Sequence, residues 1–289
     1  MAGGQEAVDD LVRLLDLEAL GDDRFKGISP PDGPQRVYGG QVAAQALVAA
    51  GRTVDRERTV HSLHGYFVRP GDPDVPITYA VENIRDGRSF SVRRSVAEQH
   101  GKVIFFMSAS FHRPEEGLDH AEPAPPDVPG PDEVPTMAER LAGYEDRAGV
   151  WAVMPRPIDV RYVGEPGWVA PGDRPAEPRQ RVWMRLDGKL PDDPVLHTCV
   201  LAFASDLTLL DSVLSAHGAV WGPGGFIGAS LDHAMWFHRP FRADEWFLYD
   251  SSSPSASGAR GLATGRMFTR DGRHIATTVQ EGLLRRVGG

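Results

Sequence analysis

The chain has 289 residues, of which 41 % are apolar and 25 % are charged, a composition typical of globular proteins. Its formal net charge of −9 argues against nucleic acid as a partner, because binding phosphates requires a basic surface. A single cysteine, Cys199, excludes an internal disulfide. The first residues show no signal-peptide pattern, and no apolar run reaches the roughly 18 residues needed to cross a bilayer. These features predict a cytoplasmic protein that does not bind membranes.

The first half of the chain predicts one buried helix followed by antiparallel strands. Residues 42–51 are mostly Ala, Val and Leu, carry no charge and end in Gly51, which is typical of a helix buried on every side. From Thr59 to Phe111 apolar and polar residues alternate, so this range predicts strands. Asp86-Gly87 is one of the turns expected between them.

A proline-rich segment over residues 114–135 separates the two halves and predicts an extended, solvated linker. We therefore expect an N-terminal unit over residues 1–115, a linker over residues 116–150 and a C-terminal unit over residues 151–289.

The second half repeats the order of the first. Asp193 and Pro194 predict the start of a helix that continues to about His217, because a capping carboxylate followed by proline is a frequent helix start. Strands are expected over residues 231–240, 246–251, 259–269 and 275–284, with a loop over residues 251–258.

Two motifs indicate an internal duplication. Phe67-Val68-Arg69-Pro70 recurs as Phe237-His238-Arg239-Pro240, and the turn at His100-Gly101 recurs at Asp271-Gly272, both about 170 residues later. Each unit has one helix that is apolar nearly all round and a sheet that can wrap it. The fold class is therefore α+β, a double hotdog of two tandem units whose antiparallel sheets can join edge to edge.

Several motifs make the resemblance to a known family specific. They are Gly39-Gly40-Gln41, Ala204-Ser205-Asp206-Leu207, residues 230–241, Ser257-Gly258-Ala259-Arg260-Gly261 and Thr278-Val279-Gln280-Glu281-Gly282. In this order they resemble the acyl-CoA thioesterase II family of double-hotdog enzymes. The resemblance covers essentially the whole chain apart from the linker, and implies a thioester hydrolase that cleaves fatty acyl-CoA by direct attack of water, without cofactor or metal.

The resemblance implies Asp206, Ser230 and Gln280 as the catalytic residues, since family members use an Asp, a Thr or Ser, and a Gln. The residue chemistry agrees with these roles. A carboxylate in an apolar setting is a stronger base than one in water. A hydroxyl and an amide can hold one water in a fixed direction.

Substrate binding is expected elsewhere in the chain. Backbone N–H groups near Gly39 and Gly40 at a helix start would stabilise charge on the thioester oxygen. His64 could line the face of the first unit or be a structural histidine with its hydrogen bonds satisfied, and Arg260 could meet a CoA phosphate or pair with an acid. The expected partners are acyl-CoA and a second copy of the chain in a homodimer. Zinc spacing is absent, because His233 and His238, five apart on a strand, would face opposite ways.

Other interpretations stay open at this point. Asp206 alone is also consistent with a helix-packing acid. Asp192 and His197 resemble the Asp and His of a hotdog enoyl-CoA hydratase, although the asparagine-proline pair expected between them is missing. A non-catalytic acyl-binding module would keep the scaffold without needing the three catalytic residues together.

Overall fold

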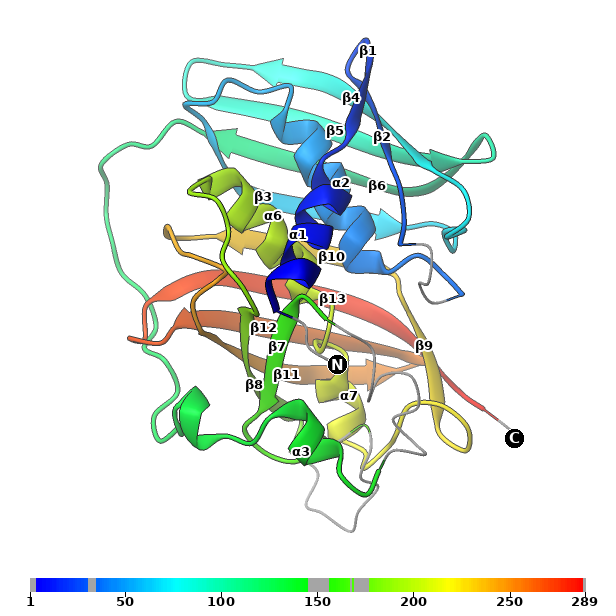
Figure 1. Cartoon of the computed structure of the whole chain (residues 1–289), viewed down its shortest axis with the longest axis vertical. Coiled ribbons are helices and arrows are strands. Elements are labelled where there is room, and N and C mark those ends of the chain that lie inside the picture. Colours follow the sequence, from blue (N-terminus) through cyan, green and yellow to red (C-terminus); the bar gives the residue numbers. More distant parts are fainter. Residues whose placement is uncertain (1–3, 31–34, 145–155, 167, 169–176, 288–289) are drawn as a thin grey trace.

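The computed structural model describes residues 4–30, 35–144, 156–166, 168 and 177–287, and it shows a single 13-stranded sheet with helices on one side (Figure 1). This arrangement confirms the predicted double hotdog. The predicted boundary at residues 150 and 151 lies outside the described residues, and the division into units stays a prediction.

The first half forms one end of the sheet, with strand order β1-β2-β4-β5-β6-β3. Its elements are α1 (Gly4–Leu15), β1 (Glu18–Gly21), β2 (Arg24–Gly27), α2 (Gly39–Gly51), β3 (Thr59–Phe67), β4 (Ile77–Asp86), β5 (Phe90–Gln99) and β6 (Lys102–His112). The short hairpin of β1 and β2 extends the predicted sheet by pairing with β4.

The second half continues the same sheet in the order β10-β13-β12-β11-β8-β7, with β9 also paired to β13. Its elements are the 3₁₀ turn η1 (Pro131–Glu133), α3 (Met137–Leu141), β7 (Ile158–Tyr162), β8 (Arg179–Leu186), α6 (Pro194–Ser205), α7 (Asp211–Ser215), β9 (Phe226–Ser230), β10 (Asp232–Phe237), β11 (Phe247–Ser257), β12 (Arg260–Thr269) and β13 (His274–Arg286). Antiparallel pairing of β3 with β10 joins the two halves, with Tyr66 opposite Asp232.

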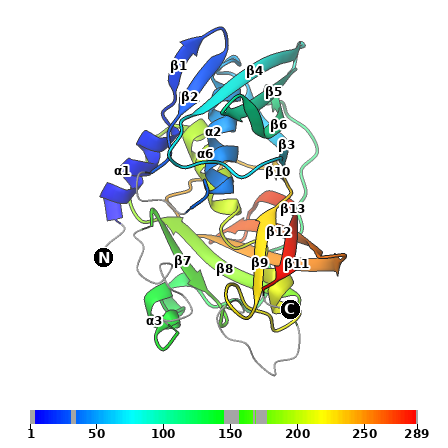
Figure 2. The same cartoon turned by 90° about the vertical axis from the view of Figure 1, so that its right-hand side faces the viewer.

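The two central helices, α2 and α6, lie side by side where the halves meet (Figures 1 and 2). They run in opposite directions, because the start of α2 contacts the end of α6. A Cβ atom on Gly40 would lie 2.4 Å from the carbonyl oxygen of Phe203, so this approach requires glycine. At the other end, Gly51 of α2 lies close to Val195 of α6. The pair therefore has two comparable ends.

The predicted helix over residues 195–217 is wrong in its length. Asp193 caps α6 and Pro194 is its first residue, as expected, but α6 ends at Ser205 and Asp206 is its C-cap. A separate short helix, α7, follows. The helix ends there because the Asp206 carboxylate turns toward hydrogen-bond donors on other elements instead of continuing the apolar face. The loop expected over residues 251–258 is also wrong, since β11 continues to Ser257.

The linker is solvated only in its first part: residues 114–123 are exposed, as predicted, whereas several residues from Ala124 onward pack on the sheet. From β6 it crosses to the second half (Figure 1), where Ala124, Val128 and Val134 pack on the outer side of the sheet. The Trp183 indole N–H donates to the Pro129 carbonyl at 2.9 Å. A proline-rich chain has no internal hydrogen bonds, so its carbonyl groups are available to side chains of the sheet. Hence this segment covers part of the outer side of β8, β11 and β12.

Candidate active site

Asp206 lies at the end of α6, where donors from three other elements reach its carboxylate. Gln280 Nε2 on β13 donates to Oδ1 at 2.8 Å, and Ser230 Oγ at the end of β9 donates to the same oxygen at 3.3 Å. The backbone N–H of Gly40, in the first turn of α2, is a further donor. The positive end of one helix dipole thus meets a carboxylate placed at the negative end of another.

The three predicted catalytic side chains contact one another. Besides its bond to Asp206, Gln280 Nε2 donates to Ser230 Oγ at 2.6 Å. Gln280 is fully buried, whereas Asp206 and Ser230 stay partly exposed. A solvent molecule or a substrate can therefore approach Asp206 and Ser230, whereas the Gln280 amide lies behind them, away from solvent.

Burial raises the pKa of the Asp206 carboxyl above its ordinary value. The hydrogen bonds from Gln280, Ser230 and Gly40 oppose this shift. The result is a carboxylate that is more basic than one in water and that is fixed in direction, which suits a general base.

The first half contributes the start of α2 to this site. A Cβ atom on Gly39 would lie 2.7 Å from Asp206 Oδ2 and 3.1 Å from the Phe67 ring, so glycine is needed for the carboxylate to fit. The expected use of Gly40 is changed in one respect: its N–H group holds the Asp206 carboxylate in this structure.

His233 is the residue of the site that the sequence analysis missed. It is 1 % exposed on β10, and its Nδ1 lies 3.2 Å from Gln280 Oε1. Its Nε2 lies 2.8 Å from Ser205 Oγ. Period-two alternation with the buried Met235 could have placed this ring on the helix side, but His233 was considered only as a metal ligand.

His64 and Arg260 do not join this group. Leu63 and Gly65 face the helices, so His64 between them faces away, and its ring packs edge-on against Trp236 with centroids 4.9 Å apart. Arg260 is exposed, and its Nε lies 3.0 Å from Glu281 Oε1. The alternative that Arg260 pairs with an acid is therefore the one observed.

Asp192 and His197, the two residues of the hydratase interpretation, form their contacts away from Asp206. Asp192 is largely exposed and forms an ion pair with Arg242. His197 is buried, and its Nδ1 accepts a hydrogen bond from the Ala243 backbone N–H at 3.0 Å. Burial lowers the pKa of His197. Neither side chain joins the group around Asp206. Among the described residues, no three His, Cys, Asp or Glu side chains are grouped as a metal site would require.

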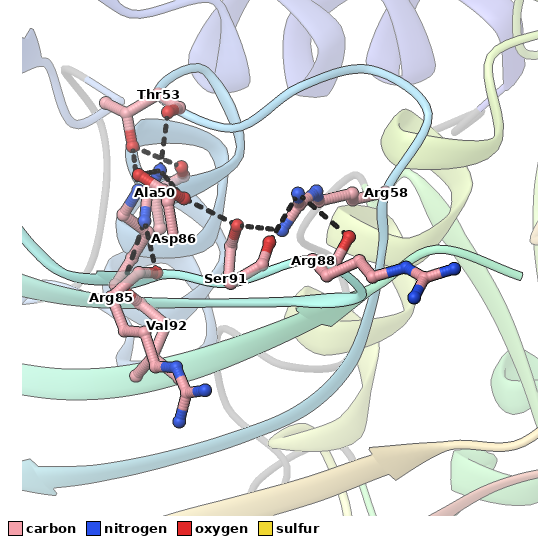
Figure 3. Close-up of polar contacts among 10 residues, drawn as sticks. Ala50, Thr53, Arg58, Arg85, Asp86, Arg88, Ser91 and Val92 are labelled. Atoms are coloured by element: carbon pink, nitrogen blue, oxygen red, sulfur yellow. Dashed lines mark hydrogen bonds and ion pairs between the residues drawn. The ribbon is translucent and has the colours of Figure 1, made fainter.

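The other end of the helix pair has a different set of side chains (Figure 3). There the buried Arg93 on β5 donates to Thr53 Oγ1 and to the Thr53 carbonyl just after α2, at 2.9 and 3.0 Å. Its NH2 group also lies 2.9 and 3.1 Å from the two oxygens of Asp86. Ser91 Oγ donates to Asp86 at 2.6 Å. This end is closed by the Arg93–Asp86 ion pair and by the hydrogen bonds of Arg93 to Thr53.

Comparison with known proteins identifies the family. A family profile described as acyl-CoA thioesterase matches residues 158–283, and one described as acyl-CoA thioesterase N-terminal domain matches residues 29–112. Acyl-coenzyme A thioesterase 8 from Homo sapiens is 40 % identical over 286 residues, covering 94 % of this chain and 88 % of that protein. Acyl-CoA thioesterase 2 from Haemophilus influenzae is 38 % identical over 288 residues, covering 97 % and 98 %.

Solved structures agree with these matches. A crystal structure of an acyl-CoA thioesterase II from Mycobacterium marinum is 45 % identical, covers 96 % of this chain and 98 % of its own, and superimposes with a TM-score of 0.77. The chain belongs to the acyl-CoA thioesterase family.

Proposed function

We propose that the chain hydrolyses fatty acyl-CoA to a free fatty acid and CoA by direct attack of a water held by Asp206, Ser230 and Gln280. The observation that carries this proposal is the mutual contact of the three side chains, all within 3.3 Å of a neighbour in the group. They come from the end of α6, from β9 and from β13, which are distant in sequence.

In this mechanism the Asp206 carboxylate takes a proton from the water as its oxygen attacks the thioester carbonyl carbon. Ser230 and Gln280 hold the water in line. The carbon–sulfur bond then breaks, and the proton on Asp206 passes to the departing CoA thiolate. The products are the carboxylic acid and the thiol, and Asp206 is ionised again. Gly39 lies against the Asp206 carboxylate, so its backbone is close to the reacting groups, whereas the Gly40 N–H is already engaged by Asp206. His64 and Arg260 face away from Asp206 and are left out of the mechanism.

The proposal is tested by measuring thiol release from acyl-CoA of short, medium and long chain length, with crotonyl-CoA hydration measured beside it. Thiol release with no hydration is expected. Hydration without thiol release would support the hydratase interpretation, and neither reaction across all chain lengths would support the binding module. Either result would overturn the proposal.

We further propose a cytoplasmic homodimer. Cys199 is buried as a free thiol whose pKa burial raises to about 12, so it is suited to a reducing compartment and protected from oxidation. Tyr66 and Phe90 are exposed on the uncovered outer side of the first half, a surface suited to association. Among the described residues, no helix is long and apolar enough to span a bilayer. Light scattering coupled to size exclusion should give twice the chain mass; a monomeric mass would contradict the dimer.

A further inference from the structure

We propose that His233 is a positioning residue of the water-activating site, and that its ring determines which way the side-chain amide of Gln280 faces. The inference rests on the proposed function, since it concerns the group that holds the water. It is carried by the hydrogen bonds on the two sides of the imidazole and by the corresponding positions in the first half.

The amide of Gln280 has a direction that matters for catalysis. Its nitrogen donates both hydrogens, to Asp206 Oδ1 at 2.8 Å and to Ser230 Oγ at 2.6 Å. Rotation of the amide by half a turn would place its oxygen against the carboxylate oxygen of Asp206 and would remove two donors. The site therefore depends on the orientation of one amide.

On the opposite side, His233 Nδ1 faces the amide oxygen at 3.2 Å. A contact of this kind is attractive only if Nδ1 carries a proton. Burial lowers the pKa of His233, so the ring is neutral and has one N–H group. The proton lies on Nδ1 when Nε2 accepts a hydrogen bond. Ser205 Oγ lies 2.8 Å from Nε2 and 2.8 Å from the Ala202 carbonyl oxygen, and in the proposed arrangement its single hydrogen points to Nε2.

Ser205 is held in place for this contact. Its backbone carbonyl accepts a hydrogen bond from the Tyr249 hydroxyl at 2.9 Å, and that hydroxyl also contacts Thr278 Oγ1 at 2.8 Å. Ser205, His233 and Gln280 thus form a chain of side chains that ends at Asp206. A proton on Nε2 instead would leave two lone pairs facing each other between His233 and Gln280.

The duplicated half supports the coupling. The register of β3 and β6 places Leu63 opposite Ala109. In the second half, His233 and Gln280 directly adjoin the Ala234–Val279 pair of β10 and β13, and their side chains are in contact. By the offset that relates Phe67 to Phe237, Leu63 corresponds to His233. Where the glutamine is absent, the histidine is absent too. A histidine needed only for packing beneath the helix would not have to disappear with it.

The test compares three substitutions in the full-length enzyme, with kcat and KM measured by thiol release from palmitoyl-CoA. The amide nitrogen of asparagine can take the place of Nδ1, so His233→Asn keeps the donor to Gln280. Glutamine reaches the place of Nε2, so His233→Gln keeps only the contact to Ser205. His233→Leu removes both, as in the first half.

We expect His233→Leu to lower kcat about 30-fold, with KM changed less than threefold, because a misplaced amide disturbs the reaction more than binding. His233→Asn should recover at least one third of the wild-type kcat, and His233→Gln should not. If His233→Leu does not fold, the Asn and Gln variants decide the question by themselves, since both are polar and differ only in which contact they keep.

A second measurement separates positioning from a structural role. In a Gln280→Ala background, adding His233→Leu should lower kcat by less than threefold, because no amide remains to be oriented. Multiplication of the two effects would overturn the inference, as would equal or better recovery by His233→Gln. A normal kcat in His233→Leu would also overturn it, leaving the proposed function intact. A normal kcat in Gln280→Ala would instead defeat the proposed site itself.

Discussion

The two halves of the chain place the same row of positions under the central helices, but they fill it differently. In the second half the row is His233 on β10, Gln280 on β13 and Ala263 on β12. In the first half it is Leu63 on β3, Ala109 on β6 and Arg93 on β5. In the second half the middle position is the polar Gln280 and its neighbour is the small Ala263, which leaves room for reacting groups. In the first half the middle position is the small Ala109 and its neighbour is the large Arg93, which leaves none.

The C-terminal ends of α2 and α6 also differ between the two halves. Asp206 is the C-cap of α6, and Arg52 is the C-cap of α2. Asp206 meets the glycine-rich start of the other helix, whereas Arg52 turns outward to Asp16, 2.6 Å away. Duplication therefore supplies two similar helix ends, and under the proposed function one of them serves catalysis and the other stability. The active place still requires both halves, because α2 lends its first turn.

The largest expected effect in the catalytic row comes from Gln280→Ala. This change removes two hydrogen bonds to the water-holding group, so kcat for acyl-CoA should fall about 10²-fold. The melting temperature should change little, since a cavity left beside Ser230 can admit water. Steady-state kinetics with a thermal melt on the same sample would check both statements, and turnover within twofold of wild type would refute the first.

Arg93→Leu should have the opposite profile. The change removes the ion pair of Asp86 and the donor to the Thr53 carbonyl, so the free energy of unfolding should fall by about 3 kcal/mol. The kcat of the folded enzyme should stay within twofold, because the row of the first half is not catalytic. Urea unfolding and thiol release are the measurements.

Arg94→Leu provides a matched control for Arg93. Arg94 is the next residue on β5, faces the other side of the sheet and lies 3.6 Å from Glu82 in an exposed ion pair. Its loss should cost about 1 kcal/mol or less. A tenfold fall of kcat in Arg93→Leu alone, with folding intact, would mean that the first row takes part in catalysis.

The smallest effect concerns α7, which has no counterpart in the first half. Its buried Asp211 accepts hydrogen bonds from the Tyr162 hydroxyl at 2.9 Å and the Trp221 indole at 2.8 Å, and burial raises its pKa to about 7. Between pH 4 and 7 the unfolded chain has therefore released this proton and the folded chain has not, so Asp211 lowers stability as pH rises through this window.

Asp211→Asn removes the titrating carboxyl group. The asparagine amide can still accept a hydrogen bond from Trp221 while it donates one to Tyr162. The melting temperature of the variant minus that of wild type should be a few degrees more positive at pH 8 than at pH 4.5. An equal difference at both pH values would show that Asp211 does not titrate in this window.

The features of the fold that could be predicted from the sequence are those that depend on neighbouring residues along the chain. The strands, the start of α6 and the duplication followed from alternation, capping and repeated turns. The end of α6 did not, because Leu207 to Leu210 continue the apolar spacing past Asp206, and only contacts with β9, β13 and α2 end the helix there. The packing of the linker from Ala124 onward could not be predicted, because it depends on Trp183 and other side chains distant in sequence.

The site itself was predicted in part. Asp206, Ser230 and Gln280 came from motifs and do lie together, although their roles stay a proposal. The meeting of Gly40 with Asp206 depends on how two helices dock, which no local pattern encodes. His233 could have been identified from the sequence as a residue of the site, because a histidine on the buried face of a strand needs hydrogen-bond partners.

The central claim is that one end of the helix pair activates water and the other does not. It is tested most directly by measuring kcat for the two C-cap variants, Asp206→Ala and Arg52→Ala, at saturating acyl-CoA. We predict a loss of roughly 2 to 4 powers of ten for Asp206→Ala and a change within twofold for Arg52→Ala. Near-normal turnover in Asp206→Ala, or equal losses in both variants, would contradict this account.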